Sequence, residues 1–148
     1  MPYAVEADVV RAAGGRERLI QLTDHEKLKE VDQALLLAKI AEADSWMNSH
    51  FEKRYLVPID GAETPEVVRR ISARLTVLFL REDVDALTPV DITRWEQINT
   101  WLAGVRDGNI SPGLEPRPAE SAHSAAAGTG DRESLKFSLT REKFEGFA

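Results

Sequence analysis

The side chains that could do chemistry in this sequence are few and widely spaced. The chain has no cysteine, which excludes a thiolate nucleophile, a thiolate metal site and a disulfide framework. Its three histidines, His25, His50 and His123, lie far apart and have no third ligand at metal-binding spacing. We therefore expect surface or structural histidines and no metal site.

The acidic and small residues form no catalytic pattern either. Glu42 and Asp44 lie two positions apart on a predicted helix, where side chains point roughly 200° apart and cannot share a substrate. A solvated face or a salt bridge between subunits is the expected role of this pair. The glycines at 14–15 and 128–130 lack the flanking strand and the lysine of a phosphate-binding loop. The sequence predicts no enzyme and no cofactor.

A row of arginines is the most prominent charged feature. Arg70, Arg74 and Arg81 fall on one face of a predicted helix, opposite its apolar stripe. Such a row is typical of an exposed helix face. The alternatives are a salt-bridge face between subunits and the wall of a nucleic-acid channel.

Two tryptophans on the following predicted helix are candidates for an interface. Trp95 and Trp101 are six positions apart, about 240° around a helix. One of them can therefore lie in the core while the other, Trp101 in our prediction, is exposed and anchors a partner. The alternative is that both belong to the core.

Helical periodicity and capping signals predict the elements that position these residues. A short element over 6–13 ends at Gly14. Thr23 or Asp24 resembles a helix cap before His25, and the main helix covers about 29–54. Two apolar lines give this helix a wide buried face: Val31, Ala34, Leu35, Ala38, Ala41, Ser45 and Ser49, and beside them Leu37, Ile40, Met47 and Phe51.

Two further helices begin at threonine–proline pairs. Thr64 is the predicted N-cap of a helix that runs to about Glu82, and Thr88 that of a helix that ends at Gly108. The first carries a buried stripe of Val67, Ile71, Leu75, Leu78 and Phe79. The fold class predicted is all-α, a small bundle of about four helices.

The C-terminal part of the chain has a different composition. Residues 1–110 are the predicted helical domain, residues 111–130 are a flexible linker rich in Pro, Gly, Ala and Ser, and residues 131–148 are an arm. The segment 134–140 alternates apolar and polar side chains, as a short strand does. Because apolar side chains are not left in solvent, we expect the arm to dock on this domain or on a neighbouring subunit through Leu135, Phe137, Leu139, Phe144 and Phe147.

Length and charge exclude several classes of protein. The 148 residues predict one domain, and 19 basic against 25 acidic residues give a net charge of −6. This excess of acidic residues argues against nucleic-acid binding through the phosphate backbone as the main role of the protein. The longest apolar run, around 34–38, is far below the roughly 20 residues of a membrane span. With no signal peptide pattern at the N-terminus, we expect a cytoplasmic location and no membrane partner.

Several short segments carry a family pattern. They are Tyr3-Ala4 to Asp8 with 19–24, the run 41–47 leading into Arg54-Tyr55-x-x-Pro58, Arg94-Trp95 with Trp101-Leu102 and Gly108, and Phe137 to Phe147. Together they resemble the small neck proteins of Mu-like phages and prophages, a family of head–tail connector or head-completion proteins. The chain departs from that pattern at 71–75. The resemblance implies structural roles for Asp44, Arg54, Tyr55, Pro58, Arg94, Trp95 and Gly108.

The resemblance also implies a function in the virion neck, after assembly in the host cytoplasm. Such a protein is an adaptor that forms a dodecameric ring between the portal protein and a tail, stopper or tail-terminator protein. Genomic DNA passes through the lumen without specific binding, which suits an acidic chain. The arm then reaches a neighbour, and the interface residues expected are Arg70, Arg74, Arg81, Trp101 and the apolar residues of the arm.

Two other functions stay open from the residues alone. A small host helical adaptor that binds a protein partner without catalysis predicts a stable small oligomer. A DNA-binding protein predicts DNA affinity that falls with salt. The connector, in contrast, predicts a poorly associated monomer that forms a ring on its portal.

Overall fold

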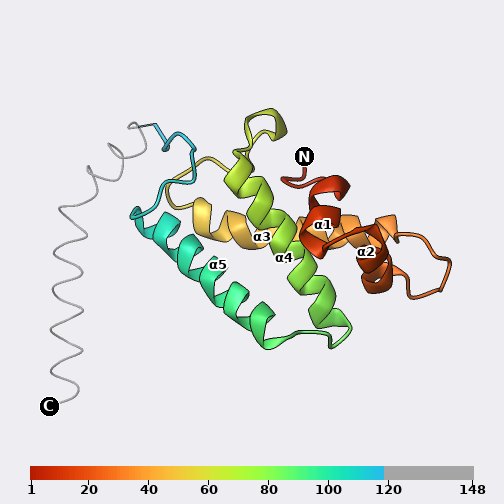
Figure 1. Ribbon diagram of the computed structural model, residues 1–148. Helices are drawn as coiled ribbons and strands as arrows, with labels where there is room; N and C mark the ends of the chain where they lie inside the picture. The colour runs from red at the N-terminus through yellow and green to blue at the C-terminus, as the bar shows by residue number, and fades with distance from the viewer. Residues whose placement is uncertain (119–148) are drawn as a thin grey trace, which may run out of the picture. The chain divides into compact units, whose positions relative to one another are not determined.

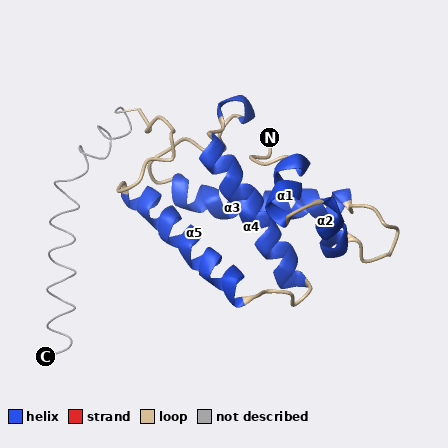
Figure 2. Cartoon of the chain, viewed as in Figure 1, coloured by secondary structure: helices blue, strands red, loops and turns tan. Residues whose placement is uncertain are grey.

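The computed structural model of the chain describes residues 1–118, and these residues fold into helices (Figures 1 and 2). The all-α fold class is therefore confirmed, with five α-helices in the described part where about four are predicted. They are α1 (Glu6–Ala13), α2 (Arg16–Thr23), α3 (Gln33–Phe51), α4 (Glu66–Asp83) and α5 (Pro89–Asp107), and a 3-10 turn, η1 (Gly61–Glu63), precedes α4. The predicted strand-like segment 134–140 and the arm as a whole lie outside the described residues.

The additional helix is α2, which occupies a segment where the sequence predicts only a cap. Gly14 adopts a left-handed φ of 88° and ends α1, as predicted, and α2 begins two residues later. No helix begins near His25. Instead the Asp24 carboxylate accepts hydrogen bonds from the N–H groups of Leu28 and Lys29, at 2.8 and 2.7 Å, and organises the loop before α3. Asp side chains stabilise such local loops as readily as helix starts, which explains the error.

Helix α3 is shorter than predicted, and of its two predicted apolar lines only the second is buried, with Ile40, Met47 and Phe51 inside and Leu37 exposed. It begins after Asp32, whose side chain accepts a hydrogen bond from the Leu35 N–H at 3.0 Å. The prediction that the line through Ala34 and Ala38 is buried is wrong, because both are exposed. Larger side chains determine the face that turns inward, since they bury more apolar area. The buried residues of α3 are Leu36, Ile40, Ala43, Asp44, Met47 and Phe51.

Helix α4 is the centre of the bundle. It packs against each of the other four α-helices, and Figure 1 shows it crossing α3, with α1 and α2 on one side and α5 on the other. From Ile71 to Leu80 every side chain except Arg74 is buried. Val67, predicted to be buried, is exposed, and Val68 lies inside in its place. The N-cap is Pro65 and not Thr64, whose hydroxyl donates to the Asp60 carbonyl instead.

Two apolar clusters share α3 and α4. One gathers α3, α4 and α5 around Phe51, Leu75 and Leu102, and the other gathers α1 and α2 against Leu36 and Leu80. Ile110 and Leu114 pack on the first cluster, so packing continues past residue 110 within the compact unit Met1–Glu115.

Candidate partner-binding surfaces

Asp44 lies in the interior, where it joins three segments of the chain. Its side chain is 8% exposed and accepts hydrogen bonds from the Tyr3 N–H at 2.9 Å and the Ser72 hydroxyl at 2.7 Å. The expectation of a solvated face or a subunit salt bridge is therefore wrong for this residue. Burial raises the pKa of Asp44, although both hydrogen bonds act in the opposite direction. This carboxylate holds the N-terminus against α3 and α4, and it is not available to a partner.

Tyr3 extends the same network to the loop after α3. Its hydroxyl donates to the Asn48 side chain and accepts a hydrogen bond from the Ile59 N–H at 3.0 Å. Burial raises the pKa of Tyr3. The loop between these contacts contains the buried Tyr55 and the cis peptide bond that precedes Pro58.

Arg54 and Gly108, far apart in the sequence, meet at the carboxyl end of α5. The Arg54 guanidinium donates hydrogen bonds to the carbonyls of Arg106 and Asp107, each at 3.0 Å. Gly108 has a left-handed φ of 83°, and a Cβ at this position would lie 2.5 Å from the guanidinium carbon. Arg54, which follows α3, therefore holds the carboxyl end of α5 in contact with the carboxyl end of α3, and Gly108 leaves room for it.

The two tryptophans of α5 are both half-buried, so neither is an exposed anchor. Trp101 packs edge-on against Phe51, with ring centroids 6.3 Å apart. Trp95 lies between Phe79 and Trp46, at centroid distances of 5.9 and 5.4 Å. The more exposed tryptophan is Trp46 on α3, which the sequence reasoning did not single out.

Arg81 does not join the predicted arginine row, because it is bound to α5. Its Nη1 lies 2.6 Å from Oδ1 of Asp91, a residue whose side chain is 1% exposed. Burial acts to raise the pKa of Asp91, but hydrogen bonds from Thr88 together with the Arg81 charge lower it overall. Asp91 also completes the capping box at the start of α5 with Thr88. Arg81 is therefore an internal clamp between α4 and α5.

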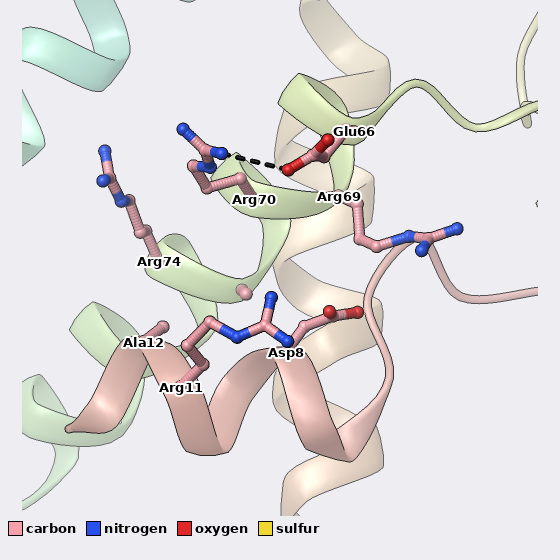
Figure 3. Close-up of a pocket in the computed structure, with 8 residues that line it drawn as sticks. Asp8, Arg11, Ala12, Glu66, Arg69, Arg70 and Arg74 are labelled. Atoms are coloured by element: carbon pink, nitrogen blue, oxygen red, sulfur yellow. Dashed lines mark hydrogen bonds and ion pairs between the residues drawn. The ribbon is translucent and has the colours of Figure 1, made fainter. Parts of the chain in front are cut away.

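Arg70 and Arg74 instead line a hollow of about 250 Å³ between α1 and α4 (Figure 3). We call this hollow the arginine groove. Its lining residues are Asp8, Arg11, Ala12, Glu66, Arg69, Arg70, Ala73 and Arg74. The small side chains of Ala12 and Ala73 leave the space between the two helices. Figure 3 shows Arg11 extending from α1 into the groove, and Arg70 and Arg74 extending outward from α4.

The arginine groove carries more positive charge than its surroundings balance. Arg70 pairs with Glu66 at 3.0 Å, whereas the side chains of Arg11, Arg69 and Arg74 make no ion pair or hydrogen bond within residues 1–118. Guanidinium groups bind carboxylates and phosphates through paired hydrogen bonds. The groove can therefore hold an anionic partner group, on a chain whose net charge is −6.

The sequence predicts two of the four groove arginines and misses the other two. Arg11 belongs to α1 and Arg69 lies one position before the predicted row, so the shared site exists only once α1 packs on α4. Arg94, which the family pattern includes, is exposed on α5 and borders a further small hollow with Arg74 and Arg81.

A second hollow, of about 200 Å³, lies where α4 ends and α5 begins. We call it the apolar groove, and it is lined by Leu78, Phe79, Glu82, Leu87, Asp91, Ile92 and Trp95. Leu87 and Ile92 are 43% and 52% exposed, and the nearby Val84 and Val90 are exposed too. This concentration of exposed apolar side chains is typical of a surface that a partner covers.

Within residues 1–118 the structure has no helix that is both long and apolar enough to cross a membrane. In the same part of the chain, no three His, Asp or Glu side chains are placed to hold a metal ion. The predicted docking residues Leu135, Phe137, Leu139, Phe144 and Phe147 lie outside the described residues.

A comparison with protein families gives one match over most of the chain. The model of a family described as Bacteriophage Mu, Gp36 matches residues 3–129. A comparison with curated proteins gives no match.

Proposed function

The chain belongs to the Bacteriophage Mu Gp36 family, and we propose that it is a structural protein of the virion neck. In this proposal it is a non-catalytic head–tail connector that completes the head after assembly in the host cytoplasm. Copies of the chain form a ring, dodecameric in the expectation from the family, between the portal protein and a tail or stopper protein. Genomic DNA passes through the lumen without specific binding.

The observation that carries the proposal is the arginine groove on an otherwise acidic chain. A ring made of head-to-tail contacts needs two different, complementary surfaces on each subunit. Three arginines without an acidic partner within residues 1–118 form one such surface. The acidic remainder of the next copy supplies carboxylates that fit it, because opposite potentials across an interface favour specific association.

The same charge distribution suits a channel that DNA crosses. A net charge of −6 repels the phosphate backbone, so DNA moves past the protein without being held. Besides the host adaptor, the arginine groove raises a DNA-binding protein as a further alternative, since guanidinium groups also bind phosphate.

The test is complementation of a phage that lacks this gene. We expect the gene deletion to give separate heads and tails in electron micrographs, and the wild-type chain to restore joined particles. The Arg70→Glu/Arg74→Glu variant should fail to restore them while keeping its helical circular dichroism, because both positions are exposed. Like charges across a contact cost several kcal/mol, which weakens the contact more than tenfold.

The matched control is Lys27→Glu/Lys29→Glu, an equal change of charge in the exposed loop before α3. It should restore joined particles. Virion images without density for this chain at the neck would refute the proposal, and a stable small oligomer that joins no particle would favour the host adaptor. A salt-sensitive shift of DNA that the arginine variant abolishes would assign the groove to DNA.

A further inference from the structure

We propose that the apolar groove binds the C-terminal arm of a second copy, through the phenylalanine-bearing segment 135–144. This inference deepens the proposed function, on which it rests for the ring of head-to-tail contacts. It assigns the exposed apolar surface at the α4–α5 junction to a specific occupant within the same protein.

The groove has the chemistry of a site for an aromatic side chain. Phe79 and Trp95 meet edge to face, at a centroid distance of 5.9 Å, and both line the groove. Leu87 and Ile92 border them from the loop and from α5, and both are largely exposed. Aromatic rings prefer the edges and offset faces of other rings, so these walls favour a phenyl group over an aliphatic one.

The arm has a complementary pattern. In an extended segment Leu135, Phe137 and Leu139 lie on the same face, because side chains alternate along a strand. Lys136, Arg141 and Lys143, against the single acid Glu142, leave the segment 135–144 with a net positive charge.

The rim of the groove supplies the opposite charge. Glu82 lines the groove, and Asp85 follows in the adjoining loop, with both residues exposed. Opposite charges at a rim set the orientation and the register of a bound segment more than its affinity. We therefore assign the phenyl group to the groove and the basic residues of the arm to its acidic rim.

The head-to-tail ring of the proposed function favours a second copy over the same chain as the donor of the arm. Gly113, near the end of the described residues, lies beside Pro65 at the start of α4. The groove begins at Leu78, which is about 20 Å further along that helix at 1.5 Å per residue. A donor segment that leaves one end of α4 and an acceptor at the other end is the arrangement that propagates from copy to copy. Residues 119–134 span up to about 50 Å when extended, so the arm can reach this groove in its own chain as well as in a neighbour, and a double-cysteine chain separates the two cases by closing within one monomer or by forming multimers.

Disulfide trapping tests the contact in a chain that has no cysteine of its own. A full-length Ile92→Cys chain is mixed with a full-length Leu139→Cys chain that carries a size tag and keeps Phe137, and the mixture is oxidised. We expect a covalent heterodimer of the two chains. Leu28→Cys replaces Ile92→Cys in the control, because Leu28 is 65% exposed but lies in the loop before α3, and we expect only traces of product.

Three results would overturn the proposal. The first is a heterodimer yield no higher than that of the control. The second is a double-cysteine chain that closes within one monomer instead of forming a ladder of multimers. The third is an unchanged heterodimer yield after Leu87→Asp is added to the Ile92→Cys chain. A buried carboxylate without a partner should lower the yield at least about tenfold, and Leu87 is exposed enough to substitute without loss of fold.

The disulfide-trapping test of the docking site and the imaging test of the neck location can fail independently of each other. The cross-linking uses the purified chain alone, so it does not depend on where the protein sits in a particle. If virion images show the chain at the neck but no heterodimer forms, the docking site is wrong and the proposed function stands. If the heterodimer forms but the neck has no density for the chain, the proposed function is wrong.

Discussion

Asp44 illustrates how one buried carboxylate can stabilise contacts between distant segments. It accepts hydrogen bonds from the backbone of Tyr3 and from Ser72, at 2.9 and 2.7 Å, and Ser72 is fully buried. Burying an ionised group is costly, and these two bonds offset part of that cost. Removing the carboxylate would leave two donors without an acceptor in the protein interior.

At the scale of the residue, we predict that Asp44→Ala lowers the free energy of unfolding by about 2–4 kcal/mol. Urea denaturation followed by circular dichroism measures the loss. The control is Glu42→Ala on the same helix, because Glu42 is exposed and pairs with Lys39 at 2.9 Å. Exposed ion pairs contribute about 0–1 kcal/mol, so the control should stay close to the wild type. Equal losses in the two variants would contradict the role given to Asp44.

The two ends of helix α5 depend both on local sequence signals and on contacts with a distant segment of the chain. Thr88 and Pro89 start α5 as predicted, and Gly108 ends it with a left-handed φ. The sequence does not indicate that Arg54 binds the carbonyls at this end, because Arg106 and Asp107 lie 52 and 53 residues further along the chain. Gly108 therefore has two functions, since it allows the turn and leaves room for the guanidinium.

At the scale of the element, we predict that Gly108→Ala destabilises the fold more than Gly113→Ala. Both glycines have a left-handed φ, 83° and 84°, so both substitutions incur the same backbone strain of about 1 kcal/mol. A Cβ at 113 meets Pro65 at an ordinary 3.5 Å, whereas one at 108 displaces Arg54 and its two hydrogen bonds. Gly108→Ala should therefore lower the free energy of unfolding by about 1–2 kcal/mol more than Gly113→Ala does, as measured by thermal or urea denaturation.

A double-mutant cycle checks this cause. In an Arg54→Ala background the difference between the two glycine variants should disappear, because no guanidinium remains to be displaced. If the excess persists in that background, the cost at 108 comes from the backbone alone.

The whole molecule combines a helical body with surfaces that its own described residues leave uncovered. Within residues 1–118, both apolar clusters consist of residues between Tyr3 and Leu114. The arginine groove and the apolar groove lie on different sides of α4, against α1 and α5 respectively. Stability and assembly should therefore depend on different parts of the chain.

At the scale of the molecule, we predict that a chain ending at residue 118 keeps the stability of the full chain at low micromolar concentration. Its free energy of unfolding should lie within about 1 kcal/mol of the full-length value, because the apolar burial that drives folding is retained. The same truncation should abolish the joining of heads and tails in complementation. A non-cooperative unfolding curve for the truncated chain would show that the arm contributes to the core.

The sequence by itself determined the helical class, the start of α5 and the glycine ends of α1 and α5. These signals are local, since a cap or a left-handed turn involves residues within a few positions of one another. Only the tertiary structure decided that Asp44 is inside, that Arg81 is bound to Asp91, and that Arg11 joins Arg74 in one groove. Periodicity gives a helix its faces, but the neighbours that pack on each face decide which of its charges are buried, paired or left for a partner.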